Sequence, residues 1–324
     1  MAAMKLALEH VRRMRGGAQA QMMRCDDEAY YIVKFQNNPQ HLRILANEML
    51  ATRLAARLGL CVPQAEVVEV RPEIIAGTPD LVIQLGLGRQ PCAAGKNFGS
   101  QFPGHPARLA VHDFLPDEQL ARVRNLADFL GVLVFDKWAC NTNGRQAIFF
   151  REPAGEENFS SPGVGSGAGA PATNSGTAST ASEPGRGAAH SSAPPASHGN
   201  SGAASYVTPY VTMMIDFGFC FNAGEWDFPD APLRGLYTRQ RVYDGVSGME
   251  AFEPWLARLE QQMTERVLGE EAARIPPEWY AGDWTALELL LERLHRRRGR
   301  VRELIFSARN SGRDPFPNWK VRHA

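Results

Sequence analysis

Apolar residues in the first third of the chain follow two periods, one typical of strands and one typical of a helix. Residues 30–35 are almost all aromatic or β-branched, which is typical of a strand. Leucine, methionine and alanine then recur every three or four positions from 40 to 58, and Gly59 follows as a helix stop. The predicted order is strand, strand, strand, helix, strand, strand, with the other strands before Gly16 and at 20–24, 65–70 and 80–85.

Helical spacing dominates the later part of the chain. Residues 117–138 predict one or two packed helices, and residues 252–268 and 285–305 predict two more amphipathic helices. The pattern therefore indicates an α+β fold with a β-rich N-terminal part and an α-rich C-terminal part.

A compositional break interrupts the second part. Residues 153–205 consist mostly of Gly, Ala, Ser, Pro and Thr, and such a segment buries too little apolar surface to offset its ordering entropy. We therefore predict a disordered insertion. Its flanks, 147–150 and 206–215, are strand-like, so the simplest interpretation is a β-hairpin with a very long turn, which loop-closure entropy permits.

Bulk properties narrow the classes of function. The 35 basic and 35 acidic residues balance, which gives no support to direct nucleic-acid binding. No run of about 18 apolar residues predicts a membrane span, and no secretory leader is recognised at the N-terminus. The five cysteines are scattered without a CxxC pair, which argues against a zinc or disulfide framework and favours a cytoplasmic location.

Two features of the first part are candidates for phosphate chemistry. Gly16, Gly17, Ala18 and Gln19 lie between two predicted strands, where glycines let backbone N–H groups approach phosphates, although an ordinary hairpin turn explains them too. Lys34 stands in an apolar strand and is followed by Glu48 on the next helix. A strand lysine paired with a helix glutamate holds ATP phosphates in kinases; the alternatives are a solvated lysine and a surface carboxylate.

Two further features flank the long insertion. The segment 138–146 lies between an apolar helix and a strand, where either a catalytic loop or a simple helix cap with a turn would fit. Asp216 ends a strand and is followed by Phe217 and Gly218. A carboxylate oxygen at this position suits Mg²⁺, and the glycine lets the chain turn away.

Taken in order, these motifs resemble the HipA-like kinases. The motifs that carry the resemblance are residues 16–19, 31–35, 47–48, 58–63, 98–100, 141–145 and 215–218. It implies a bilobal protein-kinase-like fold that clamps ATP, with lobes at 1–115 and at 116–152 plus 206–324. It also implies that Gly16 to Gln19 cover the phosphates, that Lys34 and Glu48 form the phosphate-binding pair, and that Asp216 holds Mg²⁺.

The loop departs from the family pattern at two positions. The catalytic aspartate of such kinases is replaced by Asn143, and the later metal-binding asparagine falls at Ile148. An asparagine cannot accept a proton from a substrate hydroxyl as a carboxylate does. Asn143 could instead orient a hydroxyl or bind metal through its carbonyl oxygen. Asp136 is a candidate replacement base, with a structural carboxylate as the alternative, and Arg145 is a candidate phosphate contact.

Three functions therefore stay open on the sequence. The first is an ATP- and Mg²⁺-dependent phosphotransferase acting on protein Ser or Thr hydroxyls, a substrate class that only the resemblance implies. The second is a pseudokinase that binds nucleotide or a regulatory protein partner. The third is transfer of the nucleotidyl group of ATP on the same fold.

Overall fold

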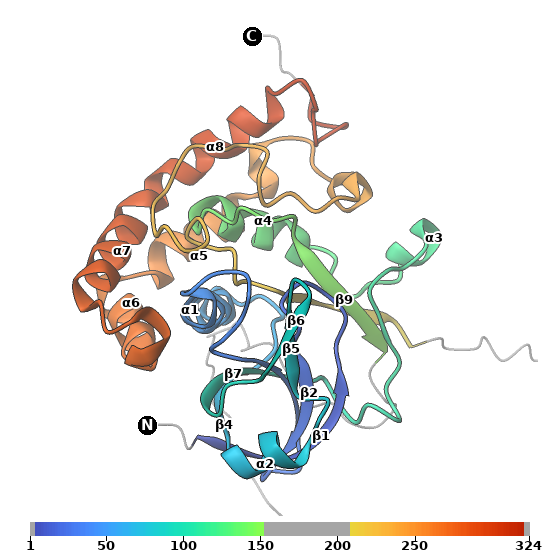
Figure 1. The fold of residues 1–324 in the computed structure, drawn as a ribbon. Helices are drawn as coiled ribbons and strands as arrows, with labels where there is room; N and C mark the ends of the chain where they lie inside the picture. The colour runs from blue at the N-terminus through green and yellow to red at the C-terminus, as the bar shows by residue number, and fades with distance from the viewer. Residues whose placement is uncertain (1–3, 152–207, 321–324) are drawn as a thin grey trace, which may run out of the picture. The chain divides into compact units, whose positions relative to one another are not determined.

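The computed structural model describes residues 4–151 and 208–320, so the predicted insertion at 153–205 lies outside the described residues (Figure 1). The strands are β1 (Lys5–Arg13), β2 (Gln21–Cys25), β3 (Tyr30–Lys34), β4 (Ala65–Val70), β5 (Val82–Leu85), β6 (Gly88–Pro91), β7 (Gly95–Gln101), β8 (Val111–His112), β9 (Gln146–Arg151) and β10 (Tyr210–Ile215). The helices are α1 (Ile44–Arg57), α2 (Pro72–Gly77), α3 (Asp117–Leu120), α4 (Asp128–Trp138), α5 (Glu253–Gln262), α6 (Glu265–Ala272), α7 (Trp284–Arg297) and α8 (Val301–Arg309). The short 3-10 turns are η1 (Gln240–Tyr243), η2 (Met249–Ala251), η3 (Pro277–Tyr280) and η4 (Arg298–Arg300).

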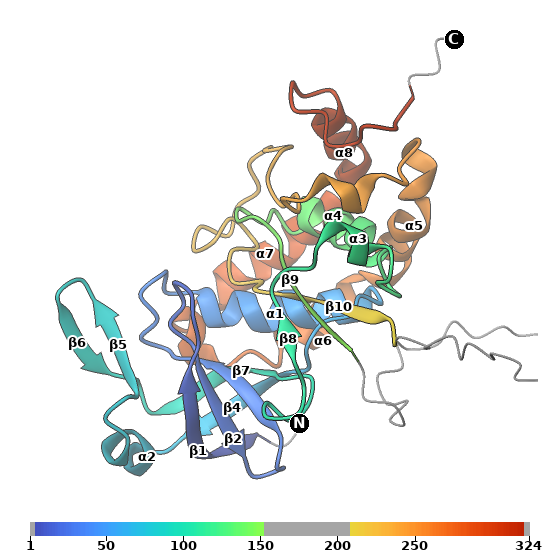
Figure 2. The same cartoon turned by 90° about the vertical axis from the view of Figure 1, so that its right-hand side faces the viewer.

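The first strands close into a small barrel in the order β1, β2, β3, β7, β4, and β4 pairs back with β1 in parallel. Inward-facing side chains of β2, β3 and β4, such as Met23, Val33 and Val68, fill its interior. Helix α1 packs against β4 and β7 of the barrel and against α6 (Figure 2). The predicted strands at 20–24, 30–35 and 65–70 and the predicted helix at 40–58 are confirmed within a few residues.

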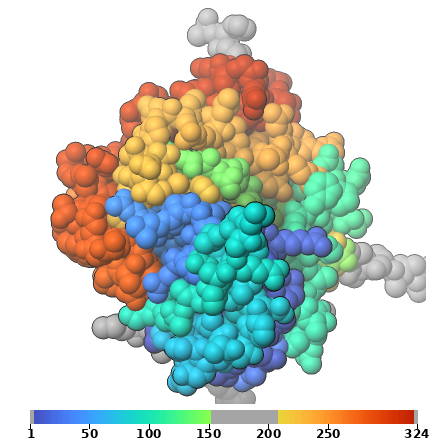
Figure 3. Space-filling view, viewed as in Figure 1, coloured from blue at the N-terminus to red at the C-terminus, as the bar shows by residue number. Residues whose placement is uncertain are grey.

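Strand β7 is a strand that the sequence analysis did not predict, although residues 98–100 were singled out as a motif. It lies between β3 and β4 in the barrel and pairs with both. The short hairpin β5–β6 stands beside the barrel. On the face shown in Figure 3, its surface (teal) borders the segment of α1 (blue), and the segment after β10 (yellow) borders that segment in turn.

The helices of the later part enclose the main core. Helix α4 is apolar on nearly every side and buries Phe129, Val132, Phe135 and Trp138. The single helix predicted at 252–268 is wrong, because the chain breaks after α5 and Thr264 caps a new helix, α6, by accepting a hydrogen bond from the Val267 N–H. None of the described helices is long and apolar enough to span a bilayer.

The predicted hairpin across the insertion is confirmed. Strands β9 and β10 pair antiparallel from Arg151 opposite Tyr210 to Gln146 opposite Ile215. Alternation puts Ile148 and Phe150 in a small apolar cluster, while Ala147 and Phe149 face the main core. The hairpin therefore ends with Gln146 and Ile215 side by side, and Asp216 follows at once.

Candidate functional site

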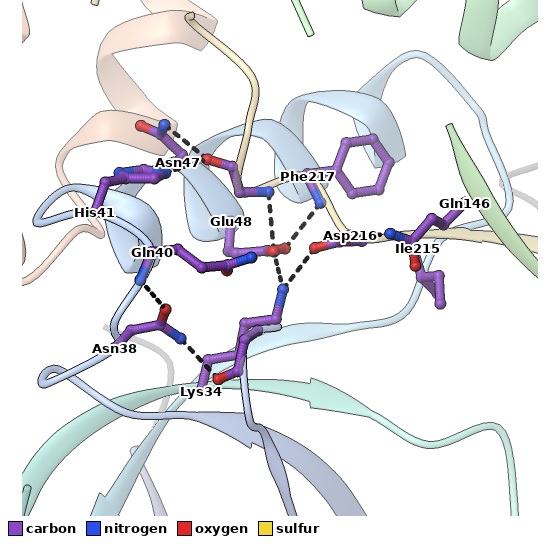
Figure 4. A network of polar contacts seen from close by, with 12 residues as sticks. Lys34, Asn38, Gln40, His41, Asn47, Glu48, Gln146, Ile215, Asp216 and Phe217 are labelled. Carbon is purple, nitrogen blue, oxygen red and sulfur yellow. Dashed lines mark hydrogen bonds and ion pairs between the residues drawn. The ribbon is translucent and has the colours of Figure 1, made fainter. Parts of the chain in front are cut away.

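Lys34, Glu48 and Asp216 come together from three separate elements (Figure 4). Lys34 ends β3, Glu48 lies in the second turn of α1, and Asp216 directly follows β10. The Lys34 Nζ donates a hydrogen bond of 2.7 Å to Asp216 Oδ1 and another to Glu48 Oε1. The three side chains are only 10%, 3% and 17% exposed, respectively. Buried charges of this kind are retained only where they are paired, so the cluster is a built feature of the fold.

Glu48 also fixes the turn that presents Asp216. Its Oε2 accepts a hydrogen bond from the Phe217 N–H at 3.1 Å, and its Oε1 accepts one from the Gly218 N–H at 2.9 Å. Asp216 has a positive φ of 61°, an unusual conformation for a residue other than glycine. A Cβ on Gly218 would lie 2.9 Å from Glu48 Oε1, so only glycine fits that close approach.

The ion cluster shifts the pKa values of its two carboxyl groups in opposite directions. Burial alone would lower the pKa of the Lys34 ammonium, but Glu48 and Asp216 outweigh it and raise that pKa. Burial would raise the pKa of Asp216, but Lys34 outweighs it and lowers that pKa. At the more deeply buried Glu48, burial exceeds the opposing effect of Lys34 and raises the pKa. Asp216 is therefore the carboxylate best kept ionised for a cation.

Asn47 and His41 hold the chain after Asp216 against α1. Asn47 Nδ2 donates to three backbone carbonyls, those of residues 218, 220 and 223, and its Oδ1 accepts from Trp226 Nε1 at 2.7 Å. His41 Nε2 lies 2.9 Å from the Gly218 carbonyl oxygen and donates to it, and burial lowers the pKa of the imidazole. These contacts position the turn from the helix side, a role that the sequence alone did not assign to His41.

The glycine turn is held rigidly and leaves backbone donors free. Gln19 donates from Nε2 to the Gln84 carbonyl and accepts from the Gln84 N–H at 2.7 Å, so its side chain fastens the turn to β5. Asn38 Nδ2 donates to the Ala18 carbonyl at 2.9 Å. Among the described residues, the N–H groups of Gly17 and Ala18 have no hydrogen-bond partner. Two free backbone N–H groups are what an anion requires.

Gln40 links the glycine turn to the ion cluster, and sequence reasoning missed it. A Cβ on Gly17 would lie 3.4 Å from Gln40 Nε2, so the turn and this side chain are in contact. In Figure 4 the Gln40 side chain points toward Lys34 and Glu48. Its Oε1 is buried and has no hydrogen-bond partner. A buried polar atom without a protein partner is uncommon in folded proteins, so this oxygen is open to a hydrogen bond from a water or a ligand.

The candidates Asp136 and Arg145 satisfy each other instead of facing the ion cluster. Arg145 Nε donates to Asp136 Oδ2 at 2.8 Å and its Nη2 donates to Oδ1, and both side chains are fully buried. Arg145 Nη1 donates to the Ile215 carbonyl at 2.7 Å, and the guanidinium lies over the Phe217 ring. In this arrangement the two groups are occupied with each other, so the roles of Asp136 as a base and of Arg145 as a phosphate contact stay predictions.

Asn143 does not direct its carbonyl oxygen toward Asp216. Its Oδ1 accepts a hydrogen bond from the Gly144 N–H at 2.9 Å, and its own N–H donates to Asn141 Oδ1 at 3.0 Å. Asn141 in turn donates to the buried Asp136. As it stands, the Asn143 side chain closes a turn.

Gln146 is the loop residue that does reach Asp216. Its Nε2 donates to Asp216 Oδ2 at 2.6 Å, while Ile148 is packed in the apolar cluster of the hairpin. The signal that could have found it was the pairing of 146 with 215, which follows from the predicted hairpin once its register is known. Within residues 4–151 and 208–320, no group of three or more His, Cys, Asp or Glu could hold a metal ion.

Comparisons with known proteins give one family. The sequence profile of a family described as HipA-like kinase matches residues 8–148, a span that contains the glycine turn, Lys34, Glu48 and the loop through Gln146. The resemblance to this family is thereby confirmed over that span. A comparison with curated proteins finds no match.

Similar solved structures include two of one enzyme, the Golgi casein kinase. The first is 10% identical, has a TM-score of 0.45, and covers 94% of this chain and 74% of its own. The second, with Mn/ADP bound, is 8% identical, has a TM-score of 0.39, and covers 95% and 73%.

Proposed function

We propose that this chain, which matches the HipA-like kinases over residues 8–148, binds ATP with a divalent cation and transfers a phosphoryl group to a protein Ser or Thr hydroxyl. The observation that carries the proposal is the burial of Lys34 between Glu48 and Asp216. A fold tolerates the cost of desolvating three charges where they serve a charged ligand.

Each part of the site has a role in this proposal. Lys34 contacts phosphate oxygens through its ammonium, and Glu48 holds that ammonium in place. The free N–H groups of Gly17 and Ala18 bind phosphate from the glycine turn, and Gln40 lies between that turn and Lys34. In this proposal, the Lys34 ammonium and the N–H groups of the glycine turn contact the phosphates from two sides.

The donor set at the end of the hairpin fits a divalent cation. Asp216 offers a carboxylate whose pKa is lowered, and Gln146 offers an amide beside it. Mg²⁺ in nucleotide sites is commonly held by one or two carboxylates together with phosphate oxygens. When bound, the cation supplies charge neutralisation at the phosphates. In this proposal, Gln146 stands in for the family asparagine that Ile148 has replaced.

The proposal includes a two-lobed arrangement around the site. Residues 1–115 would form the N-terminal lobe, and residues 116–152 with 206–324 the C-terminal lobe. Lys34 and Glu48 come from the first, and Asp216 and Gln146 from the second, so the polar contacts between them would close the lobes on the nucleotide. A cytoplasmic location stays a prediction of the sequence.

A second candidate function is a nucleotide-binding pseudokinase. The observation that favours it is the lack of a carboxylate in the loop 139–146, together with the neutralisation of Asp136 by Arg145. Without a base, the site would bind nucleotide and act through a regulatory protein partner. Positioning and electrostatics supply most of the catalysis in phosphoryl transfer, so the missing base does not by itself decide between the two.

Calorimetry with ATP and Mg²⁺ on wild type, Lys34→Met and Lys96→Met tests the site. Lys96 is a matched control because it also lies in the barrel but is 45% exposed and pairs with Glu278 at the surface. We expect binding by wild type and Lys96→Met and a loss of at least tenfold in Lys34→Met. Equal binding by all three variants, or none by wild type, would refute the proposed site.

ATP labelled at the γ or the α position then separates the reactions. Transfer of the γ label to protein supports the phosphotransferase, and transfer of the α label supports nucleotidyl transfer. Binding without either transfer leaves the pseudokinase.

A further inference from the structure

A pocket of about 300 Å³ lies beside the candidate site, with Gln146 and Ile215 in its lining. The residues that matter for its chemistry are Asp113, Phe114, Gln146, Ile215, Tyr237 and Arg239. Gln146 lines the pocket and also donates to Asp216 Oδ2, so one side chain contacts both the pocket and the proposed cation ligand. A group held in this pocket is therefore next to the place where phosphate would be.

The strand register explains why Asp113 reaches this place. Strand β8 pairs with β9 at Val111 opposite Phe150 and at His112 opposite Phe149. The chain then continues past Ile148 toward the Gln146 end of β9, and Asp113 is the next residue. A segment remote in sequence from the loop thus delivers a carboxylate to its edge.

Most charges at the pocket are already neutralised. Arg145, which lines the pocket, is paired with Asp136, and Arg239 donates to Asp117 and to the Leu115 carbonyl. Asp113 is exposed and has no ion-pair or hydrogen-bond partner among the described residues. The pocket therefore carries one uncompensated charge, and it is negative.

The aromatic ring next to Asp113 favours the same kind of ligand. Phe114 is 61% exposed, so part of its ring is open to a ligand. The Arg239 guanidinium already lies over this ring, 4.4 Å from its centre. A ring that stacks with one guanidinium on one face, beside a free carboxylate, suits a second cationic side chain.

We infer that this pocket receives a segment of a protein substrate in which a Lys or Arg stands close to the acceptor hydroxyl, with Asp113 selecting the cation. The inference rests on the proposed function, since it takes Asp216 and Gln146 as the edge of the phosphate site. Tyr237 and Ile215 provide the apolar floor on which the aliphatic stem of the basic side chain packs.

Fluorescence anisotropy with two peptide pools tests this assignment. The probes are labelled nonapeptides with a central Ser and alanines elsewhere, except for one Arg in the first pool and one Glu in the second. Titrations use the full chain with Mg²⁺ and a non-hydrolysable ATP analogue, in wild type, Asp113→Asn and Asp113→Lys. Glu118→Lys is the matched control, because Glu118 is exposed on α3 and does not line the pocket.

We expect wild type and Glu118→Lys to prefer the Arg pool by about fivefold, the scale of one exposed ion pair. Asp113→Asn should abolish the preference and Asp113→Lys should reverse it. An unchanged preference in Asp113→Lys, or no peptide binding by a nucleotide-bound protein, overturns the inference while the nucleotide site stands. If Asp113→Lys reverses the preference but the wild-type protein binds no nucleotide, the proposed function is refuted and the pocket remains a peptide site.

Discussion

Removal of the Lys34 charge is the perturbation whose consequences follow most directly from the structure. In Lys34→Met, the methionine fills much of the same volume, but Glu48 and Asp216 are left facing each other without the ammonium between them. Glu48 keeps its bonds from the Phe217 and Gly218 N–H groups, whereas Asp216 keeps the one from Gln146. The variant should fold but be less stable.

The magnitude follows from the geometry of the cluster. At an effective dielectric constant of about 20, unit charges about 4 Å apart attract by about 4 kcal/mol, and Lys34 has two such partners. Desolvation of the buried ions offsets several kcal/mol of that attraction, so the cluster stabilises the fold by much less than the sum of its two attractions. Truncating one side leaves uncompensated charge, and we expect a loss of about 3–5 kcal/mol in the free energy of unfolding at neutral pH.

The loss should depend on pH in a definite direction. Burial already raises the pKa of Glu48, and without Lys34 its pKa rises further. A carboxyl whose folded pKa exceeds its unfolded value of about 4.3 binds more protons in the folded state, so stability falls as pH rises between the two values. The gap in the free energy of unfolding between wild type and Lys34→Met should therefore widen as the pH rises above the folded pKa of Glu48 in wild type, by at most about 1.4 kcal/mol per pH unit.

Urea unfolding between pH 5 and 8 measures this effect. The double variant Lys34→Met/Glu48→Gln should recover part of the stability and lose the pH dependence, because the group that titrates is gone. Lys96→Met, at an exposed ion pair, should change stability by less than about 1 kcal/mol. A Lys34→Met variant as stable as Lys96→Met at every pH would refute the account of the buried cluster.

Three further changes test other parts of the site. Asp216→Asn should weaken Mn²⁺ binding, followed by electron paramagnetic resonance, by at least about tenfold, and Gln146→Ala should weaken it by less; an unaffected Gln146→Ala would exclude it as a ligand. Asn143→Asp, which restores a carboxylate, should raise γ-phosphoryl transfer by about 100-fold at unchanged nucleotide affinity, and no gain would mean that the base is not limiting. Gly218→Ala should lower the free energy of unfolding by about 1–3 kcal/mol, because its Cβ would overlap Glu48 Oε1; a neutral effect in thermal unfolding would contradict the close approach.

Local patterns were enough for the elements that carry Lys34 and Glu48. The β-branched run of β3 and the helical period of α1 are properties of the sequence itself, and each survives in the fold. Strand β7 could not be found this way, because Gly95, Asn97 and Gly99 all disfavour strands. Gly99 is required by packing, because a Cβ at this position would lie 2.4 Å from a Val68 methyl carbon.

The contacts of the loop 139–146 were less predictable, because its side chains bond to residues that are distant in sequence or that no helical or strand period relates to them. Asp136 and Arg145 are nine residues apart on either side of a turn, and no helical or strand period relates them. Gln146 meets Asp216 only through the register of a hairpin whose strands are separated by more than fifty residues. The break between α5 and α6 was hidden for a different reason, because apolar residues keep helical spacing across it, from Leu259 through Met263 to Val267.

The direction of the β9–β10 hairpin has a consequence for how this protein can diversify. The connection leaves the hairpin at the Arg151–Tyr210 end, whereas the Gln146–Ile215 pair stands at the other end, next to Asp216. Insertions and deletions in the connection therefore leave the strand register at the Gln146–Ile215 end unchanged. Related chains can therefore differ in the length and composition of this connection without any change in the pairing that positions Gln146 beside Asp216.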